Sequence, residues 1–146
     1  MISVNNRDFL LTPISDYIIS AEKVANVQLG NNAEHALLVL TKTGYSSIPV
    51  LDSKDRLQGL LSMGMIMDSI LGIAHIEYER LFDLKVDAIM NTDIPTIRTT
   101  DRFQRGLDLL INHPFLCVVD EDGVFAGIFT RRVVLKQFKK YIYSDQ

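Results

Sequence analysis

The chain repeats itself, and this repetition limits its possible folds more strongly than any other feature of the sequence. The segment 48–52 (IPVLD) is followed after six residues by 59–62 (GLLS), and the segment 116–120 (LCVVD) is followed after six residues by 127–130 (GIFT). Both parts of the second copy are displaced by 68 positions from the first. Two copies of one pattern in register predict two similar structural repeats.

Upstream of these segments the copies also correspond, but the displacement there is 70 positions. The segment 24–27 (VANV) matches 94–97 (IPTI), and Leu37 matches Leu107. The second copy has therefore lost two residues between its first helix and the strand that follows. Loops tolerate such deletions, so the correspondence between the copies holds.

Each copy has the same expected order of elements, β-α-β-β-α. Residues suited to helix N-caps precede the first helices, Asn32 in the first copy and Thr100 or Asp101 in the second. The second helices are expected to begin at Ser62 and Thr130. The predicted elements are helices at 33–42 and 102–112, strands at 24–27, 48–51, 57–61, 94–97, 116–119 and 124–129, and polar turns at 52–55 and 120–123.

The repeats also define the expected domain organisation. Small three-stranded sheets leave apolar faces uncovered, and packing the copies face to face buries these faces economically. The predicted fold class is α/β, of the α+β kind, with two β-α-β-β-α repeats packed about a pseudo-twofold axis and small sheets flanked by helices. The predicted parts are a lead-in at 1–12, repeat 1 at 13–67, a helical linker at 68–85, repeat 2 at 86–138 and a tail at 139–146.

Charge and composition exclude several classes of protein. The net charge of the 146 residues is −3, whereas nucleic-acid and anionic-membrane proteins need a broad basic face. No apolar run approaches the roughly 20 residues of a membrane span, and the N-terminus lacks the pattern of a signal peptide. The single cysteine, Cys117, fits a reducing compartment. We therefore expect a cytoplasmic protein that binds neither nucleic acid nor membrane.

No group of residues in the sequence suggests catalysis. The three histidines, His35, His75 and His113, lack partners at the spacing of metal ligands. Cys117 lies in an apolar run and is expected to be a small core residue. The carboxylates of 120–122 fall in a turn between strands and are expected to be solvated. The sequence predicts that the protein is not an enzyme.

The repeat resembles the CBS domain, a module that occurs in tandem pairs called Bateman modules. The residues that carry the resemblance are 44–52 with 59–62 in the first copy, and 118–120 with 122–123 and 127–132 in the second. The resemblance extends from about residue 13 to residue 138. Because almost nothing else is attached, the chain is expected to be a free-standing sensor.

The resemblance implies two ligand clefts between the copies. Each cleft combines the strand before a first helix, the turn before the next strand, and the strand-to-helix junction of the opposite copy. The second cleft would contain 93–96, 113–115 and 62–65. The ligand-binding residues implied for the first cleft are Lys23, Ala25, Val27, Tyr45, Ser46, Ser47, Pro49, Thr130, Arg131 and Arg132.

The chemistry of the first cleft favours an anion. Lys23, Arg131 and Arg132 supply cations, and the helix that begins at Thr130 supplies backbone N–H groups. The second cleft offers no lysine or arginine, so we expect only the first to be occupied. Two alternatives remain: the arginines form a solvated helix start, or Tyr45 is a packing residue. Lys23 is equally compatible with an exposed strand position.

The sequence departs from the family pattern in a way that bears on the ligand. After the strand the family has Gly-x-x-Thr/Ser-x-x-Asp, and the Asp binds both ribose hydroxyls of AMP or ATP. That position is Val133 in the second copy and Met65 in the first. Cyclic di-AMP has no free vicinal diol, and receptors for it are known among free-standing CBS pairs. We therefore expect cyclic di-AMP as regulatory ligand, with AMP, ATP or an S-adenosyl ligand as alternatives.

The resemblance also implies protein partners. We expect a homodimer that engages other proteins in its ligand-free form, with a (p)ppGpp synthetase as one candidate. The alternative from another class is a nucleotide-free dimerisation scaffold.

Overall fold

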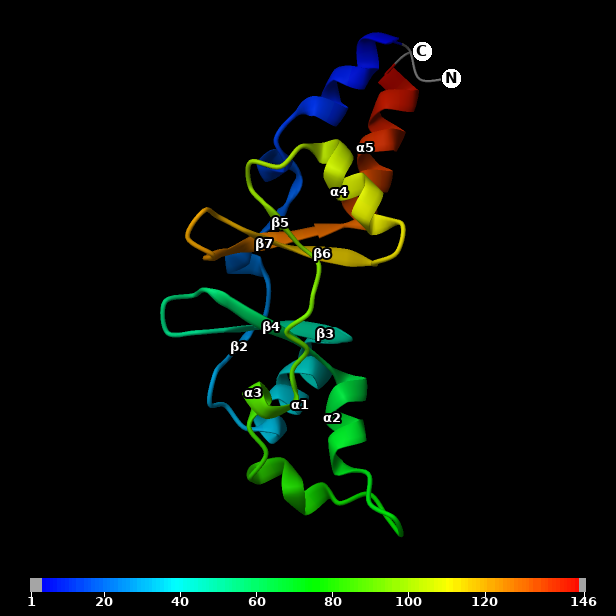
Figure 1. Cartoon of the computed structure of the whole chain (residues 1–146). Helices are drawn as coiled ribbons and strands as arrows, with labels where there is room; N and C mark the ends of the chain where they lie inside the picture. Colours follow the sequence, from blue (N-terminus) through cyan, green and yellow to red (C-terminus); the bar gives the residue numbers. More distant parts are fainter. Residues whose placement is uncertain (1–3, 145–146) are drawn as a thin grey trace. The chain divides into compact units, whose positions relative to one another are not determined.

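The structure, a computed structural model, describes residues 4–144 and the side chains of residues 8–143. The chain divides into two compact units (Figure 1). Unit 1 combines the residues up to Val24 with those from Pro95 onward, and unit 2 comprises Ala25–Ile94. Each unit has its own hydrophobic core.

Unit 2 contains a three-stranded sheet in the order β2-β3-β4. Strand β3 is parallel to β2 and antiparallel to β4, and four of its five residues are buried. Such a central strand is a continuous apolar run, as the sequence predicts. The elements of unit 2 are β2 (Val27–Gln28), α1 (Ala33–Thr43), β3 (Ser47–Leu51), β4 (Leu57–Ser62), α2 (Met63–Ile70), η4 (Tyr78–Phe82) and α3 (Val86–Ile89).

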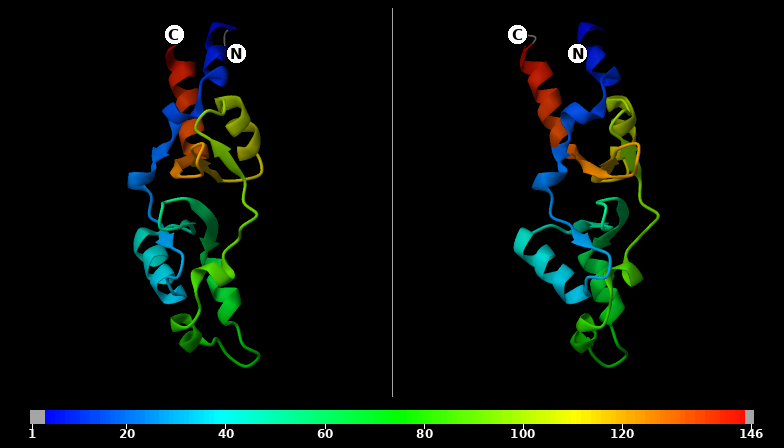
Figure 2. Two further views of the ribbon diagram at one scale, coloured as in Figure 1. Left: turned by 60° about the vertical axis from the view of Figure 1, so that its left-hand side comes forward. Right: turned by 90° about the vertical axis from the view of Figure 1, so that its left-hand side faces the viewer.

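Unit 1 contains a four-stranded sheet in the order β1-β7-β6-β5. The 3-10 helix η1 lies beside α5 in every view (Figure 2), and Phe9 of η1 stacks on Tyr141 of α5 with 4.5 Å between ring centroids. The elements of unit 1 are η1 (Val4–Leu11), η2 (Ile14–Tyr17), β1 (Ile19–Ser20), η3 (Ala21–Lys23), β5 (Thr96–Arg98), α4 (Phe103–Leu110), β6 (Phe115–Val119), β7 (Phe125–Thr130) and α5 (Arg131–Ser144).

The predicted β-α-β-β-α order is confirmed in both repeats. The register between the last two strands even shifts at the same place in each copy, between Val50 and Leu51 and between Val118 and Val119. The first strands, β2 and β5, begin two to three residues later than predicted. The second sheet has a fourth strand, since β1 pairs antiparallel with β7, and this strand was not predicted from the sequence.

The predicted N-cap of α4 is wrong. Neither Thr100 nor Asp101 caps the helix, and the N-cap position belongs to Arg102, whose side chain makes no capping bond. The Asp101 carboxylate instead accepts a hydrogen bond from the backbone N–H of Arg98 at 2.7 Å, which closes the turn before the helix. The predicted cap of α1 is confirmed, since the Asn32 side chain accepts from His35 N at 2.9 Å.

The single helix predicted over 68–85 is also wrong. Helix α2 ends at Ile70, and the next helical segment is the short η4. Between them the chain turns back: Leu71 forms a bridge with Ile76, and Gly72 N donates to His75 O at 2.9 Å. The apolar spacing arises because Ile70, Ile76 and Leu81 all contribute to the core of unit 2 from separate short segments.

Each unit also contains the first residues of the opposite repeat. In unit 1, Ile14 N donates to Asp101 O at 2.8 Å, and Phe103 N donates to Thr12 O at 2.9 Å. In unit 2, Val86 N donates to Asn31 O at 2.9 Å, and Ala33 N donates to Leu84 O at 2.7 Å. Ile14 and Val86 are both fully buried. The two repeats are therefore interlocked, since the first residues of each repeat complete the core around the other repeat's first helix.

The polar turns are built alike in both copies. Asp52 Oδ1 accepts from the backbone N–H groups of Lys54 and Arg56, which lowers the pKa of the Asp52 carboxyl below its ordinary value, the Arg56 N–H contributing most. Asp120 Oδ1 accepts likewise from the N–H groups two and four residues further on. The positions Asp55 and Gly123 are equivalent, with φ angles of 61° and 81°.

We expect substitutions at these two equivalent positions to change stability in opposite directions. Gly123→Asp should lower the free energy of unfolding by about 1 kcal/mol, because only glycine adopts a positive φ without steric cost. Asp55→Gly should raise it, by no more than about 1 kcal/mol. Urea denaturation followed by circular dichroism measures both. Equal effects of the same sign would contradict the left-handed conformation at one of the turns.

Candidate ligand-binding residues

The junction between β7 and α5 presents a capped helix start. Thr130 ends β7, and its Oγ1 accepts a hydrogen bond from Val133 N at 3.2 Å. The equivalent junction in repeat 1 is capped in the same way, because Ser62 Oγ accepts from Met65 N at 3.1 Å. Both predicted helix starts are confirmed. A hydroxyl that accepts in this way still has its own hydrogen to donate to a ligand.

The two arginines at the start of α5 have different surroundings. Arg131 donates from Nε to Leu110 O at 3.0 Å and from Nη2 to Ile111 O at 3.3 Å. These carbonyls belong to the end of α4, where the last turn of a helix leaves acceptors without partners. Arg132 is exposed and has no hydrogen bond or ion pair with any residue that the structure describes. Arg132 is therefore a cation held at a helix N-terminus, where the helix dipole disfavours it by about 0.3–1 kcal/mol.

The capping role of Arg131 was not predicted from the sequence. Helix α1 ends at Gly44, whose φ of 74° closes the helix with a bond from Gly44 N to Leu40 O. Helix α4 has no such glycine, and its C-cap Ile111 keeps a right-handed conformation. Because the end of α4 lacks a glycine cap, its carbonyls accept from a side chain of α5 instead. The sequence signal for this capping role was the absence of a glycine near residue 112.

We expect Arg131→Met to lower the free energy of unfolding by about 1 kcal/mol through the loss of these two bonds. Arg102→Met is the matched control, because Arg102 is also exposed but its side chain makes no hydrogen bond in the described structure. Thermal denaturation of both variants without ligand measures the difference. Equal midpoints for the two variants would show that the α4 carbonyls do not depend on Arg131.

Lys23 belongs to unit 1 together with the β7–α5 junction. It is the last residue of η3, which packs against β7, and its side chain is exposed. The resemblance implied that Lys23 lies in repeat 1, on the side of the cleft opposite the arginines. The pairing of β1 with β7 is the physical reason for its place in unit 1. Within this unit the candidate residues are Lys23, Thr130, Arg131 and Arg132.

The other candidate residues lie in unit 2. Tyr45 is 42% exposed, so its ring is not part of the core. Ser46 is exposed, and its carbonyl accepts from Met63 N at 3.1 Å. Val27 and Pro49 are buried, which leaves mainly their backbone for contact with a ligand. Ala25 and Ser47 are half-buried, at the approach to β2 and the start of β3.

Apolar side chains occupy the positions where the family pattern has an aspartate. Val133 packs against the core of unit 1, and Met65 packs against the core of unit 2. Met63, also implied for the second cleft, packs against the same core as Met65. Neither junction therefore carries a carboxylate at that position.

The described residues contain no group of three histidine, cysteine or carboxylate side chains that could hold a metal ion. Burial raises the pKa of the Cys117 thiol to about 12, so this cysteine is a protonated core residue rather than a nucleophile. Across residues 4–144, no helix is both long and apolar enough to cross a membrane.

Comparison with known proteins agrees with the fold and extends over nearly the whole chain. The CBS domain family model matches residues 14–72 and 86–140. Cyclic di-AMP receptor B of Bacillus subtilis (strain 168) is 51% identical over 144 residues, which cover 99% of this chain and 98% of the relative.

Solved structures give the same result. The CbpB protein of Listeria monocytogenes, solved in complex with c-di-AMP, is 61% identical with a TM-score of 0.83 over 89% of this chain and 97% of that protein. A hypothetical conserved protein from Geobacillus kaustophilus is 55% identical with a TM-score of 0.85 over 89% and 98%. The two interlocked β-α-β-β-α repeats and these matches have one explanation. The chain belongs to the CBS domain family and carries two CBS domains in tandem.

Proposed function

We propose that the protein is a non-enzymatic receptor that binds cyclic di-AMP as its regulatory ligand, through the residues of the first predicted cleft. The observation that carries this proposal is the extent of the similarity to a cyclic di-AMP receptor, 51% identity over 99% of the chain. The similarity to a CbpB protein solved with c-di-AMP, at 61% identity, supports it.

The chemistry of the candidate residues fits the two phosphodiester groups of such a ligand. Arg132 offers all of its guanidinium N–H groups, and Arg131 retains those that do not bind the α4 carbonyls. The Thr130 hydroxyl, the Lys23 ammonium and the first N–H groups of α5 complete a set of donors suited to an anion. In the other set of residues, implied for the second cleft, no lysine or arginine occurs, and we propose one occupied cleft per chain.

The apolar side chain of Val133 favours cyclic di-AMP over AMP or ATP. A carboxylate at this position would bind the two free ribose hydroxyls of a mononucleotide, and losing one such charge-assisted pair costs about 1–3 kcal/mol. A ligand whose 3′-oxygen is already in a phosphodiester loses nothing. Ala25, half-buried and small, leaves room for an adenine ring against the backbone of unit 2.

Isothermal titration calorimetry with cyclic di-AMP, AMP and ATP tests this proposal. We expect binding of cyclic di-AMP in preference to both mononucleotides. A ligand at 100 times its dissociation constant stabilises a protein by about 2.7 kcal/mol, so the melting temperature should also rise. Preference for AMP or ATP would identify an energy sensor instead. No heat and no thermal shift with any of the three would identify a nucleotide-free dimerisation scaffold.

The regulatory output is proposed to be a change in protein binding. Cyclic di-AMP would shift the equilibrium between a partner-competent and a partner-incompetent state, by no more than its difference in affinity for the two states. We propose that the ligand-free homodimer engages partner proteins in the cytoplasm, with a (p)ppGpp synthetase as one candidate. Pull-down of purified synthetase with and without cyclic di-AMP tests this step, and equal recovery in both samples would contradict it.

A further inference from the structure

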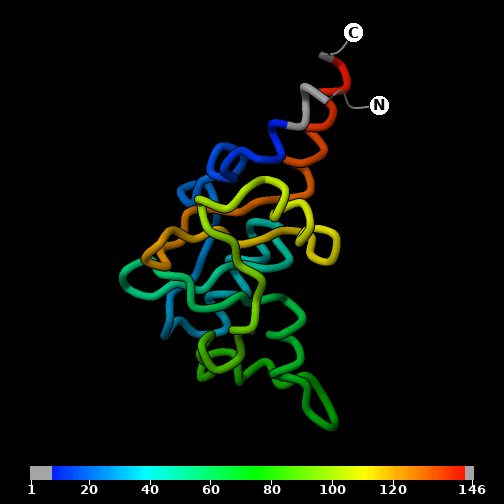
Figure 3. Tube along the Cα trace, turned by 45° about the horizontal axis from the view of Figure 1, so that its top comes forward, coloured from blue at the N-terminus to red at the C-terminus, as the bar shows by residue number. Residues whose placement is uncertain are grey.

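The equivalent helices α1 and α4 are closed by different groups at their C-terminal ends. In α1, the carbonyl of Leu40 accepts a hydrogen bond from Gly44 N at 3.0 Å. The equivalent carbonyl in α4, that of Leu110, accepts from Arg131 Nε at 3.0 Å, and the carbonyl of Ile111 accepts from Nη2 of the same side chain at 3.3 Å. The start of α5 therefore lies beside the end of α4 (Figure 3).

The two residues that repeat 2 lacks account for this difference. Between the first helix and the next strand, repeat 1 has TKTGYS at 41–46, whereas repeat 2 has INHP at 111–114. The shorter segment contains no glycine to close the helix. The position of Arg131 is occupied in repeat 1 by Met63, and at both positions the backbone N–H donates to the last residue of this segment. The backbones of the two junctions thus agree, and the junction without a glycine cap is the one whose side chain can donate.

The two bonds to α4 fix the orientation of the Arg131 guanidinium. Nε–H and one N–H of Nη2 lie along one edge of this planar group, and both donate to α4 carbonyls. The remaining N–H groups, on Nη1 and Nη2, lie along another edge. Two parallel N–H donors on one edge bind a phosphate in bidentate geometry. The end of α4 therefore holds one edge of Arg131 and leaves an edge suited to a phosphodiester.

Helix α4 also makes the position of Arg131 electrostatically tolerable. The dipole of α5 disfavours a cation in its first turn, but the dipole of α4 favours a cation beside its last carbonyls. Arg131 experiences both effects, because it lies at the start of one helix and donates to the end of the other. The cost of keeping this cation beside the N-terminus of α5 is thereby offset within unit 1.

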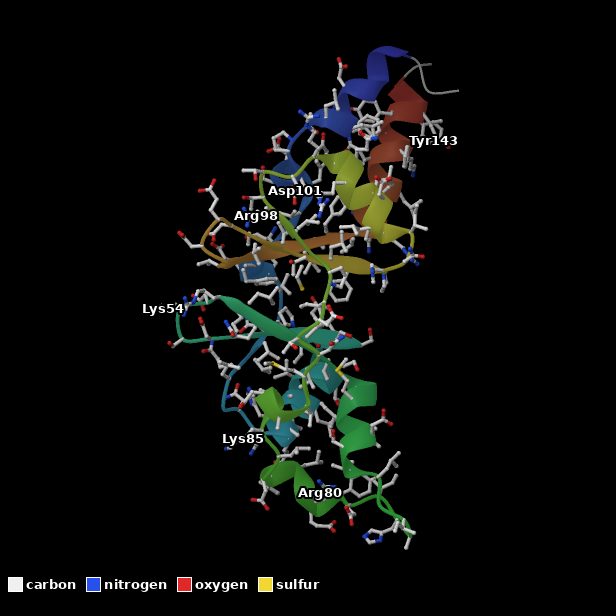
Figure 4. All side chains as sticks on the ribbon, in the orientation of Figure 1. Lys54, Arg80, Lys85, Arg98, Asp101 and Tyr143 are labelled. Carbon is white, nitrogen blue, oxygen red and sulfur yellow. The ribbon has the colours of Figure 1, made fainter. Side chains whose placement is uncertain are left out.

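The start of α4 is closed without Arg131. There the Asp101 carboxylate accepts from the backbone N–H of Arg98 at 2.7 Å, and Figure 4 labels both residues in the turn before the helix. Phe103 N, the first N–H of the helix, donates to Thr12 O at 2.9 Å. The two ends of α4 can therefore be changed separately.

We propose that the carbonyl groups of Leu110 and Ile111 position Arg131 for the phosphodiester of its ligand. These two are positioning residues, since they contact the guanidinium and not the ligand. A side chain that is already held loses less freedom on binding, which lowers the dissociation constant roughly three- to tenfold. This inference rests on the proposed function and specifies how one part of the binding site is prepared before the ligand arrives.

Replacing residues 111–112 (IN) by the sequence TKTG of 41–44 tests the proposal. This TKTG variant restores the two residues that repeat 2 lacks, so the new glycine N–H should donate to Leu110 O as Gly44 N donates to Leu40 O. The Arg131 side chain then loses its hold on α4 but stays in the chain. We expect the dissociation constant of cyclic di-AMP, measured by isothermal titration calorimetry, to rise roughly three- to tenfold.

Arg131→Met in the wild-type and TKTG backgrounds completes a double-mutant cycle. Without Arg131, the TKTG replacement should leave the dissociation constant unchanged, because α4 acts on the ligand through this side chain. Without ligand, Arg131→Met should lower the melting temperature of the wild type but not of the TKTG variant, whose helix end is closed by glycine. A purely structural role of the loop would instead give the same fold-change in affinity in both backgrounds.

Asp101→Ala is the matched control, since it weakens the turn at the other end of α4. It should lower the melting temperature yet bind cyclic di-AMP with wild-type affinity. The NMR signal of the Arg131 Nε–H group, identified by its loss in Arg131→Met, tests the proposal on the unmodified protein. We expect this N–H to be protected from exchange with water both in the free protein and in the complex with cyclic di-AMP.

The outcomes distinguish this inference from the proposal on which it rests. A wild-type protein that does not bind cyclic di-AMP overturns the ligand proposal, and the positioning with it. If the wild type binds, unchanged affinity of the TKTG variant, or an equal loss with and without Arg131, overturns the positioning by α4 alone. Loss of Nε–H protection on binding does the same, because Arg131 would then leave the α4 carbonyls to reach the ligand.

Discussion

Arg132→Met is expected to weaken cyclic di-AMP binding by at least about 100-fold while leaving the fold unchanged, because hydrogen bonds to charged groups are worth about 1.5–3 kcal/mol each and a phosphodiester accepts more than one. Methionine keeps the unbranched aliphatic stem and removes only the guanidinium. The fold should not suffer, since the Arg132 side chain is exposed and bonds to none of the described residues. Isothermal titration calorimetry measures the affinity, and thermal denaturation without ligand measures the stability.

Arg102→Met is the control for this experiment as well. It removes an exposed guanidinium from the same unit without touching the β7–α5 junction, so its affinity should equal that of the wild type. An Arg132→Met protein that also binds like the wild type would show that the phosphate is held elsewhere. A variant with low affinity and a lowered melting temperature would show instead that Arg132 supports the fold.

Arg131 and Arg132 show how much of the candidate site can be predicted from sequence patterns. The pattern correctly indicates a helix that directly follows the capping residue Thr130 and has two cations in its first turn. It does not distinguish the two cations, because the difference depends on the end of α4. The carbonyls of Leu110 and Ile111, about 20 residues earlier in the chain, accept from Arg131. Hydrogen bonds between two different elements, such as those from α5 to the end of α4, leave no periodic pattern in the sequence.

The fold shows the same division between local and distant interactions. Apolar periodicity predicts α1, β3, β6 and the final strands, since burial of one face is a local requirement of each element. The periodicity at 68–85 was misleading, because short segments separated by the turn at Gly72 reproduce the spacing of a helix. Strand β1 was missed because two residues are too few to show alternation, and their partner β7 is more than 100 residues away.

The glycine at position 127 was the sequence signal for the missed strand β1. We expect Gly127→Ala to lower the free energy of unfolding by at least about 3 kcal/mol. A Cβ atom at this position would overlap the carbonyl oxygen of Ile19 and lie 3.0 Å from its carbonyl carbon. The φ of Gly127, 153°, is also one that other residues rarely adopt. The alanine variant must therefore strain β7 or release β1.

Gly30→Ala and Gly59→Ala separate the cost of the backbone conformation from the cost of the steric overlap. Gly30 has a φ of 86° with open space around it, so its alanine variant should lose only about 1 kcal/mol, from backbone strain. At Gly59, the equivalent of Gly127 in repeat 1, a Cβ would lie 2.9 Å from Asn91 O and 2.7 Å from the flexible Met90 side chain. We expect an intermediate loss there, on the order of 1–3 kcal/mol.

Urea denaturation of the three alanine variants ranks these effects, and a Gly127→Ala loss no larger than that of Gly30→Ala would contradict the close approach of Ile19 to β7. Release of β1 has a consequence for ligand binding as well. The two residues of β1 lead directly into η3 and Lys23, and η3 itself packs against β7. Under native conditions Gly127→Ala should therefore reduce the thermal shift produced by cyclic di-AMP, although Gly127 is none of the proposed ligand-binding residues. Gly30→Ala, which is destabilised without moving β1, should keep that shift in full.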